Sequence, residues 1–406
     1  MADVIRRGVT PVGMEPPDFT SPGFKADPFP IYARLRTEAP VYRTRVGRWR
    51  VCVVTRYEDV VDVLKEPLLS NDWMATTLLT RVARPFARSM LTVDPPDHTR
   101  LRTLVQKAFT RGLVDRMHAQ VQKVCDRLLD AAAPAGRVDL VEAYALPLPL
   151  TMIADMLGIP PEDRPVFSRW SKRIFAVTSG GGAGEVLKAL PSLWLFRRYL
   201  HRLFARRRAH PEDDLVTALV QAREGGDKLS EDELQAMVVL LLGAGYDTTV
   251  NLIASGALAL LQHPVQRGRL LEDPAVSTSA IEELLRYTSP VDFSSPRLAR
   301  ADVSVGSEPV ARGEMVLAAL GSANHDPSQF PSPETLDVAR SPNKHVAFGA
   351  GAHFCLGGVL ARVEGQIALT TLFRRFPGLR LAVPPESLRW RKGLVLRALE
   401  ALPVAF

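Results

Sequence analysis

The chain has 406 residues, of which 46% are hydrophobic and 23% charged, with a formal net charge of +7. Such a composition is typical of an ordinary globular protein long enough to bury a large core. The three cysteines, Cys52, Cys125 and Cys355, are far apart and form no C-x-x-C pair, which excludes a disulfide framework and a structural zinc site. The first residues lack the apolar run of a signal peptide, and the most apolar stretch, 237–249, meets Asp247 before it could span a bilayer. We therefore expect a cytoplasmic protein that is neither secreted nor membrane-spanning.

Apolar residues recur at three- and four-residue steps in several segments, which predicts a mainly α-helical chain. The predicted helices lie in 32–39, 101–109, 114–132, 229–262 and 360–376. Strand-like alternation is confined to short pieces at 49–57, 301–310 and 314–320. Without repeats or a low-complexity linker, the sequence predicts one domain over 1–406, mainly α with a small β portion.

Two compositional features lie in the middle of the chain. The glycine run 179–184 lacks a preceding strand and the G-x-G-x-x-G spacing, which favours a loop between helices over a nucleotide site. The segment 196–210, FRRYLHRLFARRRAH, interleaves arginines with apolar residues at helical spacing. It is either the solvated face of an amphipathic helix or a surface for an acidic protein partner. Nucleic acid is disfavoured, because the aromatic interleaving of a single-strand platform is missing.

The segment HVAFGAGAHFCLGG, residues 345–358, places one of the three cysteines among four glycines. Glycines on either side of Cys355 let the backbone turn tightly, and a helical pattern follows at once. A thiolate at a helix N-terminus gains from the helix dipole and from unpaired N–H groups, which favours a metal ligand over an inert thiol. Zinc would need further ligands from distant positions, whereas haem iron needs one axial ligand from this side.

The segment resembles the cysteine-ligand loop of the cytochromes P-450, F-x-x-G-x-H/R-x-C-x-G. The pattern is met at Phe348, Gly351, His353, Cys355 and Gly357. The resemblance implies the cytochrome P-450 fold, with haem b held between a long distal helix and this proximal loop. It also implies that the thiolate of Cys355 is the axial ligand of the iron and favours O–O cleavage.

The segment LLGAGYDTTVNLI supplies polar groups within an apolar helix, as activation of dioxygen requires. Ala244 and Gly245 are small enough to leave room for a flat macrocycle. The segment resembles the family's A-G-x-D-T-T distal helix, which implies that Asp247 and Thr248 deliver protons to bound oxygen. The alternative for Thr248 alone is a bond to the carbonyl one turn back.

Two further segments resemble the family. Glu283 and Arg286 lie three apart on one helical face and match E-x-x-R. A surface ion pair is the ordinary interpretation, but the resemblance implies a structural triad that Arg340 completes from the following meander. His325 stands where arginine is frequent in the family, and Gly358 where alanine is common.

Haem propionates call for cationic donors. His98 and Arg102 are four apart in DPPDHTRLR, and Arg297 precedes a short strand. The resemblance to the family's D-P-P-x-H-x-x-x-R segment and to its arginine after E-x-x-R implies that His98, Arg102, Arg297 and His353 hold the propionates.

The resemblance covers nearly the whole chain and implies a monooxygenase of a bacterial, soluble kind, active in secondary metabolism, that inserts one atom of O2 into an apolar small molecule. The alternatives are a peroxide-driven peroxygenase and a haem protein that binds ligand without turnover. No motif for flavin, nicotinamide or an iron–sulfur cluster is found, so we expect electrons from a ferredoxin and its reductase. Arg100, Lys107, Arg111 and Arg362 are candidates for steering the ferredoxin, or form a solvated face. We expect a monomer that binds neither nucleic acid nor membrane.

Substrate identity is not readable from the sequence. Candidates for the substrate pocket are taken from where the family's recognition segments fall, with plain core packing as the alternative for each. They are Trp73, Leu79, Phe86, Phe175, Ala244, Val291, Phe293, Leu394 and Val395. The glycine-rich stretch falls where the family's substrate lid is variable.

Overall fold

The computed structural model describes residues 11, 13–46, 49–73, 88–109, 111–167, 169–170, 173, 183–223 and 226–406. The chain divides into two compact units, each assembled from segments distant in sequence. Unit 1 contains Met1–Trp73, Ser255–Gly358 and Pro385–Glu400. Unit 2 contains Met74–Ala254, Val359–Pro384 and Ala401–Phe406. Helix α11 (Glu231–Gln262) contributes to both units, because the boundary falls after Ala254.

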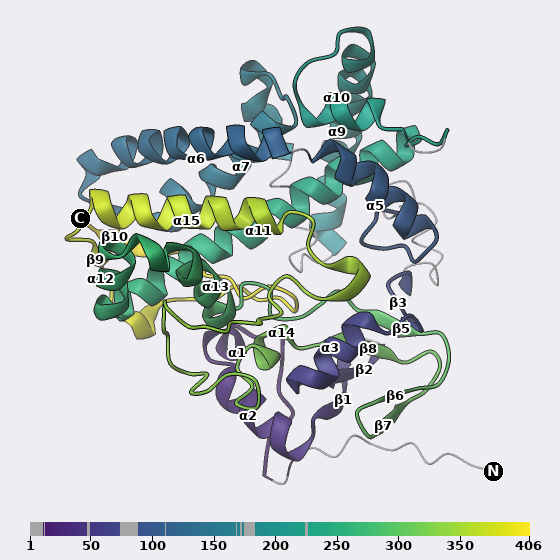
Figure 1. Ribbon diagram of the computed structural model, residues 1–406, viewed down its shortest axis with the longest axis vertical. Coiled ribbons are helices and arrows are strands. Elements are labelled where there is room, and N and C mark those ends of the chain that lie inside the picture. Colours follow the sequence, from purple (N-terminus) through teal and green to yellow (C-terminus); the bar gives the residue numbers. More distant parts are fainter. Residues whose placement is uncertain are drawn as a thin grey trace. The chain divides into compact units, whose positions relative to one another are not determined.

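The five-stranded sheet of unit 1 has the order β1-β2-β8-β5-β3 (Figure 1). Its strands are β1 (Val41–Val46), β2 (Trp49–Val54), β3 (Leu69–Ser70), β5 (Arg297–Ala299) and β8 (Met315–Ala318). Strands β2 and β8 are parallel and the other pairs antiparallel. A separate hairpin joins β6 (Val303–Val305) to β7 (Glu308–Val310).

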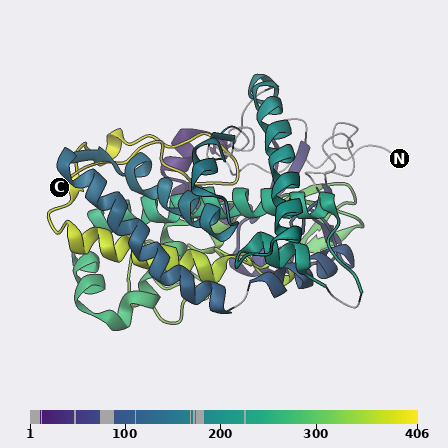
Figure 2. The same cartoon turned by 90° about the horizontal axis from the view of Figure 1, so that it is seen from above.

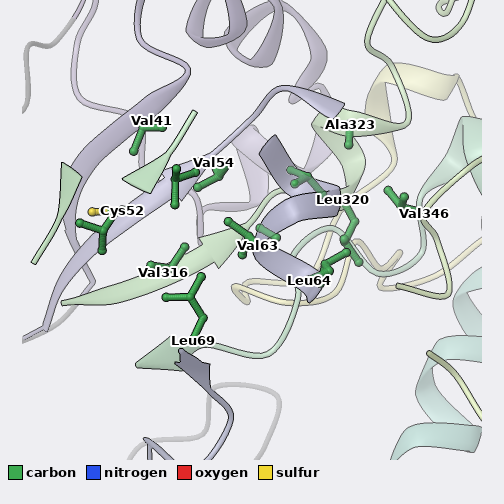
Figure 3. Packing of buried hydrophobic residues seen from close by; sticks show 14 of the residues in the cluster. Val41, Cys52, Val54, Val63, Leu64, Leu69, Val316, Leu320, Ala323 and Val346 are labelled. Atoms are coloured by element: carbon green, nitrogen blue, oxygen red, sulfur yellow. The ribbon is translucent and has the colours of Figure 1, made fainter. Parts of the chain in front are cut away.

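Helix α3 (Tyr57–Lys65) packs its apolar face on this sheet. Figure 3 shows Val63 and Leu64 of α3 among Val54 and Val316 of the central strands. The helix is amphipathic, so its buried stripe faces the strands while its charged face stays accessible. The other helices of unit 1 are α1 (Pro22–Ala26), α2 (Phe29–Glu38), α12 (Pro264–Glu272), α13 (Ser277–Thr288) and α14 (Leu320–Ala323).

Unit 2 is mainly helical. Its helices are α5 (Asp97–Ala108), α6 (Arg111–Ala132), α7 (Pro147–Met156), α9 (Ala183–Ala209), α10 (Leu215–Gln221) and α15 (Gly358–Arg375, from Val359 on). Helices α6 and α15 lie side by side in both views, and Thr371 Oγ1 donates to Gln122 Oε1 at 3.3 Å (Figures 1 and 2). A three-stranded sheet has the order β4 (Arg137–Asp139), β10 (Pro403–Ala405), β9 (Arg380–Leu381).

Short helical turns complete the described fold. They are the π-helical η3 (Val141–Ala145) and the 3-10 turns η2 (Ala133–Ala135), η4 (Pro161–Asp163), η5 (Pro274–Val276), η6 (Gly351–His353) and η7 (Pro385–Ser387).

Helix α11 is apolar and long. Within the described part of the chain it alone has the length and composition to cross a membrane, with a mean hydropathy of 1.5 over 18 residues. Over half of that window, 56%, is buried inside the protein. Such burial is typical of a core helix, which explains its apolar composition without a bilayer.

The mainly α prediction with a small β portion is confirmed. Each predicted helical segment contains most of an observed helix, and the strand-like pieces correspond to β2, β6 with β7, and β8. The glycine run lies partly outside the described residues, and its last two positions open α9.

Candidate functional site

The loop that carries Cys355 is closed by main-chain hydrogen bonds within unit 1. The N–H of Cys355 donates to the carbonyl of Phe348 at 2.9 Å, and the N–H of Phe354 donates to that of Gly351 at 3.1 Å. The turn η6 lies within this loop. Helix α15 begins three residues after the cysteine. The sequence therefore holds Cys355 at a fixed place just before a helix N-terminus.

Gly351 is required at its position by both conformation and space. Its φ of +73° lies in the left-handed region, and a Cβ would lie 2.8 Å from the carbonyl oxygen of Leu64 in α3. Gly349 has a similar φ of +72°, but a Cβ there would meet nothing within 4 Å. The cysteine loop thus rests closely on α3 at Gly351.

Side chains from other parts of unit 1 anchor the segment before the loop. His345 Nε2 lies 3.0 Å from Glu282 Oε2 in α13, and Asn324 Oδ1 accepts the N–H of Val346 at 2.8 Å. The hydroxyl of Tyr57 donates to the carbonyl of Lys344 at 2.7 Å. These contacts tie the loop to three separate elements, so its geometry is preorganised.

The three cysteines differ in accessibility. Cys52 and Cys125 are buried, and burial raises the pKa of each thiol to about 12. Cys355 is exposed. A metal takes the thiolate, so a thiol that stays protonated at neutral pH is a poor ligand. Cys355 is therefore the cysteine suited to bind iron.

The structure brings Glu283, Arg286 and Arg340 together. Arg286 donates to both carboxylate oxygens of Glu283 at 2.8 Å, and Arg340 Nε lies 3.1 Å from each of them. Glu283 and Arg286 have no accessible side-chain surface. Asn343, which the sequence did not single out, adds a hydrogen bond to Glu283 at 3.1 Å.

The two arginines also organise the meander that precedes the cysteine loop. Arg286 donates to the carbonyls of Asn324, Pro333 and Thr335, and Arg340 donates to those of Pro331 and Ser332. The buried Arg286 and the half-buried Arg340 thereby each meet a carboxylate and several carbonyls, as charges removed from water require. The meander is thus fixed around one carboxylate.

His325 replaces the arginine that the family resemblance leads one to expect. Its ring stacks on Phe29, with 3.9 Å between centroids, and Nδ1 lies 3.1 Å from the carbonyl oxygen of Gly321. Burial, followed by the nearby Arg286, lowers the pKa of His325 well below its ordinary value. A neutral imidazole therefore fills this place beside cations.

In unit 2, α11 presents one accessible face in an otherwise buried stretch. Ala244 is exposed, Asp247 and Thr248 are half-buried, and the three lie at i, i+3 and i+4. Thr248 Oγ1 donates to the carbonyl of Ala244 at 2.5 Å. This hydrogen bond is the alternative that the sequence analysis gave for Thr248. The hydroxyl is thus bonded to the main chain of its own helix.

Gly245 has a packing role on the same helix. A Cβ at Gly245 would lie 3.0 Å from Ile153 Cδ1 of α7, closer than most Cβ contacts. The missing side chain lets α7 approach α11. The close approach of α7 therefore explains this glycine without the macrocycle, and room for the macrocycle is a second, predicted reason.

The four predicted propionate donors come from both units. Arg297 on β5 and His98 on α5 are buried, whereas His353 and Arg102 are half-buried. Burial, followed by the charge of Arg102, lowers the pKa of His98, so its imidazole is neutral at neutral pH and donates one N–H.

These residues fit the haem group chemically. An accessible thiol follows a loop that Gly351 lets rest on α3, and buried cationic and N–H donors suit two carboxylates. Haem and dioxygen contacts of the individual side chains stay predictions.

The substrate-pocket candidates differ in whether the structure describes them and in how deeply they are buried. Leu79, Phe86 and Phe175 lie outside the described residues. Val291, Leu394 and Val395 are half-buried and lie together, since the N–H of Asp292 donates to the carbonyl of Val395 at 2.8 Å. Trp73 is half-buried and packs against the same apolar cluster as Leu394.

Phe293 lies in the core of unit 1. It is fully buried, and its ring makes edge contacts with Phe19 at 5.6 Å and Tyr32 at 6.2 Å between centroids. These contacts favour the core-packing alternative for this residue, and its place in the substrate pocket stays a prediction.

A buried polar cluster near these segments was missed by sequence analysis. Lys25 Nζ lies 2.5 Å from Asp292 Oδ2 and 2.7 Å from the carbonyl oxygen of Leu394, and Tyr32 donates to Asp292 Oδ1 at 2.7 Å. Arg397 donates to the carbonyls of Lys25 and Ala26. A lysine in an N-terminal helix gives no local signal of a partner 267 residues away.

Comparison with known proteins decides the family. The family model described as Cytochrome P450 matches residues 195–401. The polyketide biosynthesis cytochrome P450 PksS of Bacillus subtilis (strain 168) is 40% identical over 394 residues, covering 94% of this chain and 96% of the relative. The chain belongs to the cytochrome P450 family. The resemblance read from its motifs is thereby confirmed.

Further relatives and solved structures agree. The cytochrome P450 monooxygenase PikC of Streptomyces venezuelae is 40% identical, covering 94% of this P450 and 91% of the relative. The solved structure of PksS has a TM-score of 0.90 at 39% identity, covering 96% and 99% of the two chains. P450BioI, solved in complex with hexadec-9Z-enoic acid ligated acyl carrier protein, has a TM-score of 0.87 at 35% identity, covering 95% and 100%.

This P450 is accordingly a monooxygenase, an oxidoreductase with bacterial relatives in secondary metabolism. Membership implies haem with a cysteine thiolate ligand, and dioxygen as co-substrate.

Proposed function

We propose that this P450 inserts one oxygen atom from O2 into an apolar small molecule, by hydroxylation or epoxidation, with electrons from a separate ferredoxin and reductase. The observation that carries the proposal is the exposed thiol of Cys355 in a closed loop, where the two other cysteines are buried with a raised pKa. Haem bound through this cysteine would supply dioxygen binding and O–O cleavage.

The residues of α11 have the proton-handling role. Asp247 and Thr248 lie on the accessible face of an apolar helix, so an acid and a hydroxyl are adjacent where water is scarce. The hydroxyl of Thr248 donates to the carbonyl of Ala244. If that hydrogen bond breaks, the hydroxyl can donate to another acceptor. The triad Glu283, Arg286 and Arg340 positions the meander and takes no part in proton transfer.

The substrate is expected to be apolar. Its predicted contacts Val291, Leu394 and Val395 are apolar and half-buried, so part of their surface is accessible to a ligand. PksS, named for polyketide biosynthesis, and P450BioI, solved with an acyl-loaded carrier protein, support a polyketide or fatty acyl compound as the substrate class.

For the ferredoxin, the basic candidates are not equivalent. Arg100 is paired with Asp227 at 3.0 Å and with Glu233, which leaves less charge for a partner. Lys107 is exposed and Arg362 half-buried, whereas the side chain of Arg111 lies outside the described residues. Lys107, which donates to the carbonyl of Arg223 at 3.3 Å, and Arg362 stay candidates for steering an acidic ferredoxin.

The test is single-turnover and steady-state oxidation of an apolar acyl substrate with reductant, reductase and ferredoxin under isotopically heavy dioxygen. The proposal expects one heavy oxygen atom in the product. Product that forms with hydrogen peroxide but never with the electron donors would instead identify a peroxygenase, and binding without any product a non-catalytic haem protein. Arg362→Glu should slow reduction and weaken its salt dependence, and unchanged reduction kinetics would remove this docking site.

A further inference from the structure

Helix α9 carries an accessible stripe that the oxygenase chemistry does not use. Leu190, Trp194, Arg198 and Arg202 follow one another at four-residue steps, so each is a neighbour of the next on the helix surface. Trp194 is 60% exposed and Leu190 51%. The neighbouring Leu195 is 41% exposed. We call these five residues the α9 stripe.

The stripe is not needed to pack the helix. The opposite side of α9 is already buried through Phe196, Leu200, Leu203 and Phe204. Single exposed apolar residues are common on protein surfaces, whereas three within six residues, as at Leu190, Trp194 and Leu195, are unusual and favour an interaction site. The apolar end of the stripe is therefore available to a partner.

The other end of the stripe is basic. Arg198 lies over the Trp194 ring, with its guanidinium carbon 5.7 Å from the centroid, and forms no ion pair within the described part of the chain. Arg202 is exposed and likewise makes none among the described residues. Arginine and tryptophan are the residues most enriched where proteins bind one another. The stripe combines an apolar contact with unneutralised positive charge, which is complementary to an acidic protein.

The location of α9 limits how such a partner could serve the reaction. His201 Nε2 lies 2.8 Å from Gln235 Nε2, and Arg208 pairs with Glu231, so α9 packs on the first turns of α11. Thr248 lies 13 residues further along α11 than Gln235, which is about 20 Å at the helical rise. A protein docked on α9 at this contact would have to span that distance along α11 to reach Thr248, which an extended arm could do.

We propose that the α9 stripe docks an acidic carrier protein that presents its acyl substrate as a thioester on such an arm. The inference rests on the proposed oxygenase function and names the form in which the substrate arrives. It agrees with P450BioI, a relative in fold and sequence solved with an acyl-loaded carrier protein. An anionic membrane fits less well, because the apolar residues occupy one end of the stripe only, whereas a helix that lies on a membrane has an apolar face along its length.

The test measures binding of acyl carrier protein loaded with hexadec-9Z-enoic acid to the haem-loaded P450 by calorimetry. The variants are Arg198→Glu with Arg202→Glu, and Trp194→Ser. The matched control is Arg312→Glu, an exposed arginine in unit 1 outside the stripe. Free hexadec-9Z-enoic acid is titrated in parallel, followed by the change in haem absorption.

The proposal expects the stripe variants to weaken carrier binding at least tenfold and added salt to weaken wild-type binding, with the control and the affinity for free fatty acid unchanged. Equal carrier binding by wild type and stripe variants overturns it, as does no carrier binding by the wild type. Loss of ferredoxin or anionic-vesicle binding in the stripe variants, with carrier binding intact, overturns it in favour of those partners. Failure of the oxygenase proposal is distinguished by a separate measurement. In that case the P450 forms no product from free substrate when the electron donors are supplied.

Discussion

Lys25 and Asp292 form a buried ion pair in unit 1, with 2.5 Å between Nζ and Oδ2 and no accessible surface on either side chain. The pair connects α1 to the segment that carries Val291, and Lys25 also holds the carbonyl of Leu394. Two segments that carry substrate-pocket candidates are thus fixed to one lysine.

Removing one partner of this pair leaves an uncompensated buried charge. We expect Lys25→Met to lower the free energy of unfolding by about 3–5 kcal/mol. Lys25→Met combined with Asp292→Leu should recover part of that loss, because the unpaired carboxylate is removed, although Tyr32 then loses its acceptor. Denaturant unfolding of the single and double variants measures both effects. Equal stability of wild type and the single variant would show that the pair contributes nothing.

The cysteine loop provides a matched glycine pair. Gly351→Ala should be the more damaging change, since it combines a left-handed φ with a Cβ 2.8 Å from the Leu64 carbonyl oxygen. Gly349→Ala has the strained φ alone and should cost about 1–3 kcal/mol. The measurement is haem content together with thermal stability of each purified variant. If the two variants have the same haem content and thermal stability, the close approach of Gly351 to α3 does not contribute to stability.

Glu364 on α15 should make stability depend on pH. Burial raises the pKa of this carboxyl from its ordinary value of 4.5 to about 8. Between these two values the folded state holds a proton that the unfolded chain has lost, so stability falls as pH rises from 4.5 to about 8. The loss is about 5 kcal/mol at most.

Glu364→Gln keeps the shape of the neutral carboxyl and removes its titration. We expect urea unfolding of this variant to show a flatter pH profile and higher stability than wild type above pH 8. Parallel profiles for the two proteins across this range would contradict the buried, protonated assignment.

The proton-delivery assignment is tested on Thr248. Thr248→Ala removes the hydroxyl on the accessible face of α11, and Thr248→Ser retains one. We expect product per electron to fall roughly tenfold or more in the alanine variant, since positioned proton transfer contributes on the order of 10²–10⁴-fold. Peroxide should rise and haem content stay constant, with serine close to wild type. Coupled product formation by the alanine variant at the wild-type level would defeat the assignment.

The sequence predicted most of what is local. Periodicity located helices such as α6 and α15, and the residue spacing around Cys355 was sufficient to predict the family. Glu283 and Arg286 were also accessible to sequence reasoning, because three residues along a helix fix their proximity.

Contacts between segments distant in sequence were not predictable in this way. Lys25 and Asp292, or Asn343 and Glu283, meet only because the chain folds back on itself. The burial of Phe293 was not readable from the sequence either, because its apolar character suits core and pocket equally. The exposure of Trp194 was likewise invisible, since the same spacing describes a buried aromatic residue.

The most direct test of the account is the visible spectrum of the reduced protein under carbon monoxide, recorded for wild type and for Cys355→Ala. A red-shifted Soret band in the wild type that disappears in the variant is the predicted result, with Cys52→Ala, a buried-thiol control, retaining the band. A wild-type spectrum characteristic of histidine-ligated haem, or a red-shifted band that survives in Cys355→Ala, would contradict the assignment of Cys355 and the oxygenase proposal built on it.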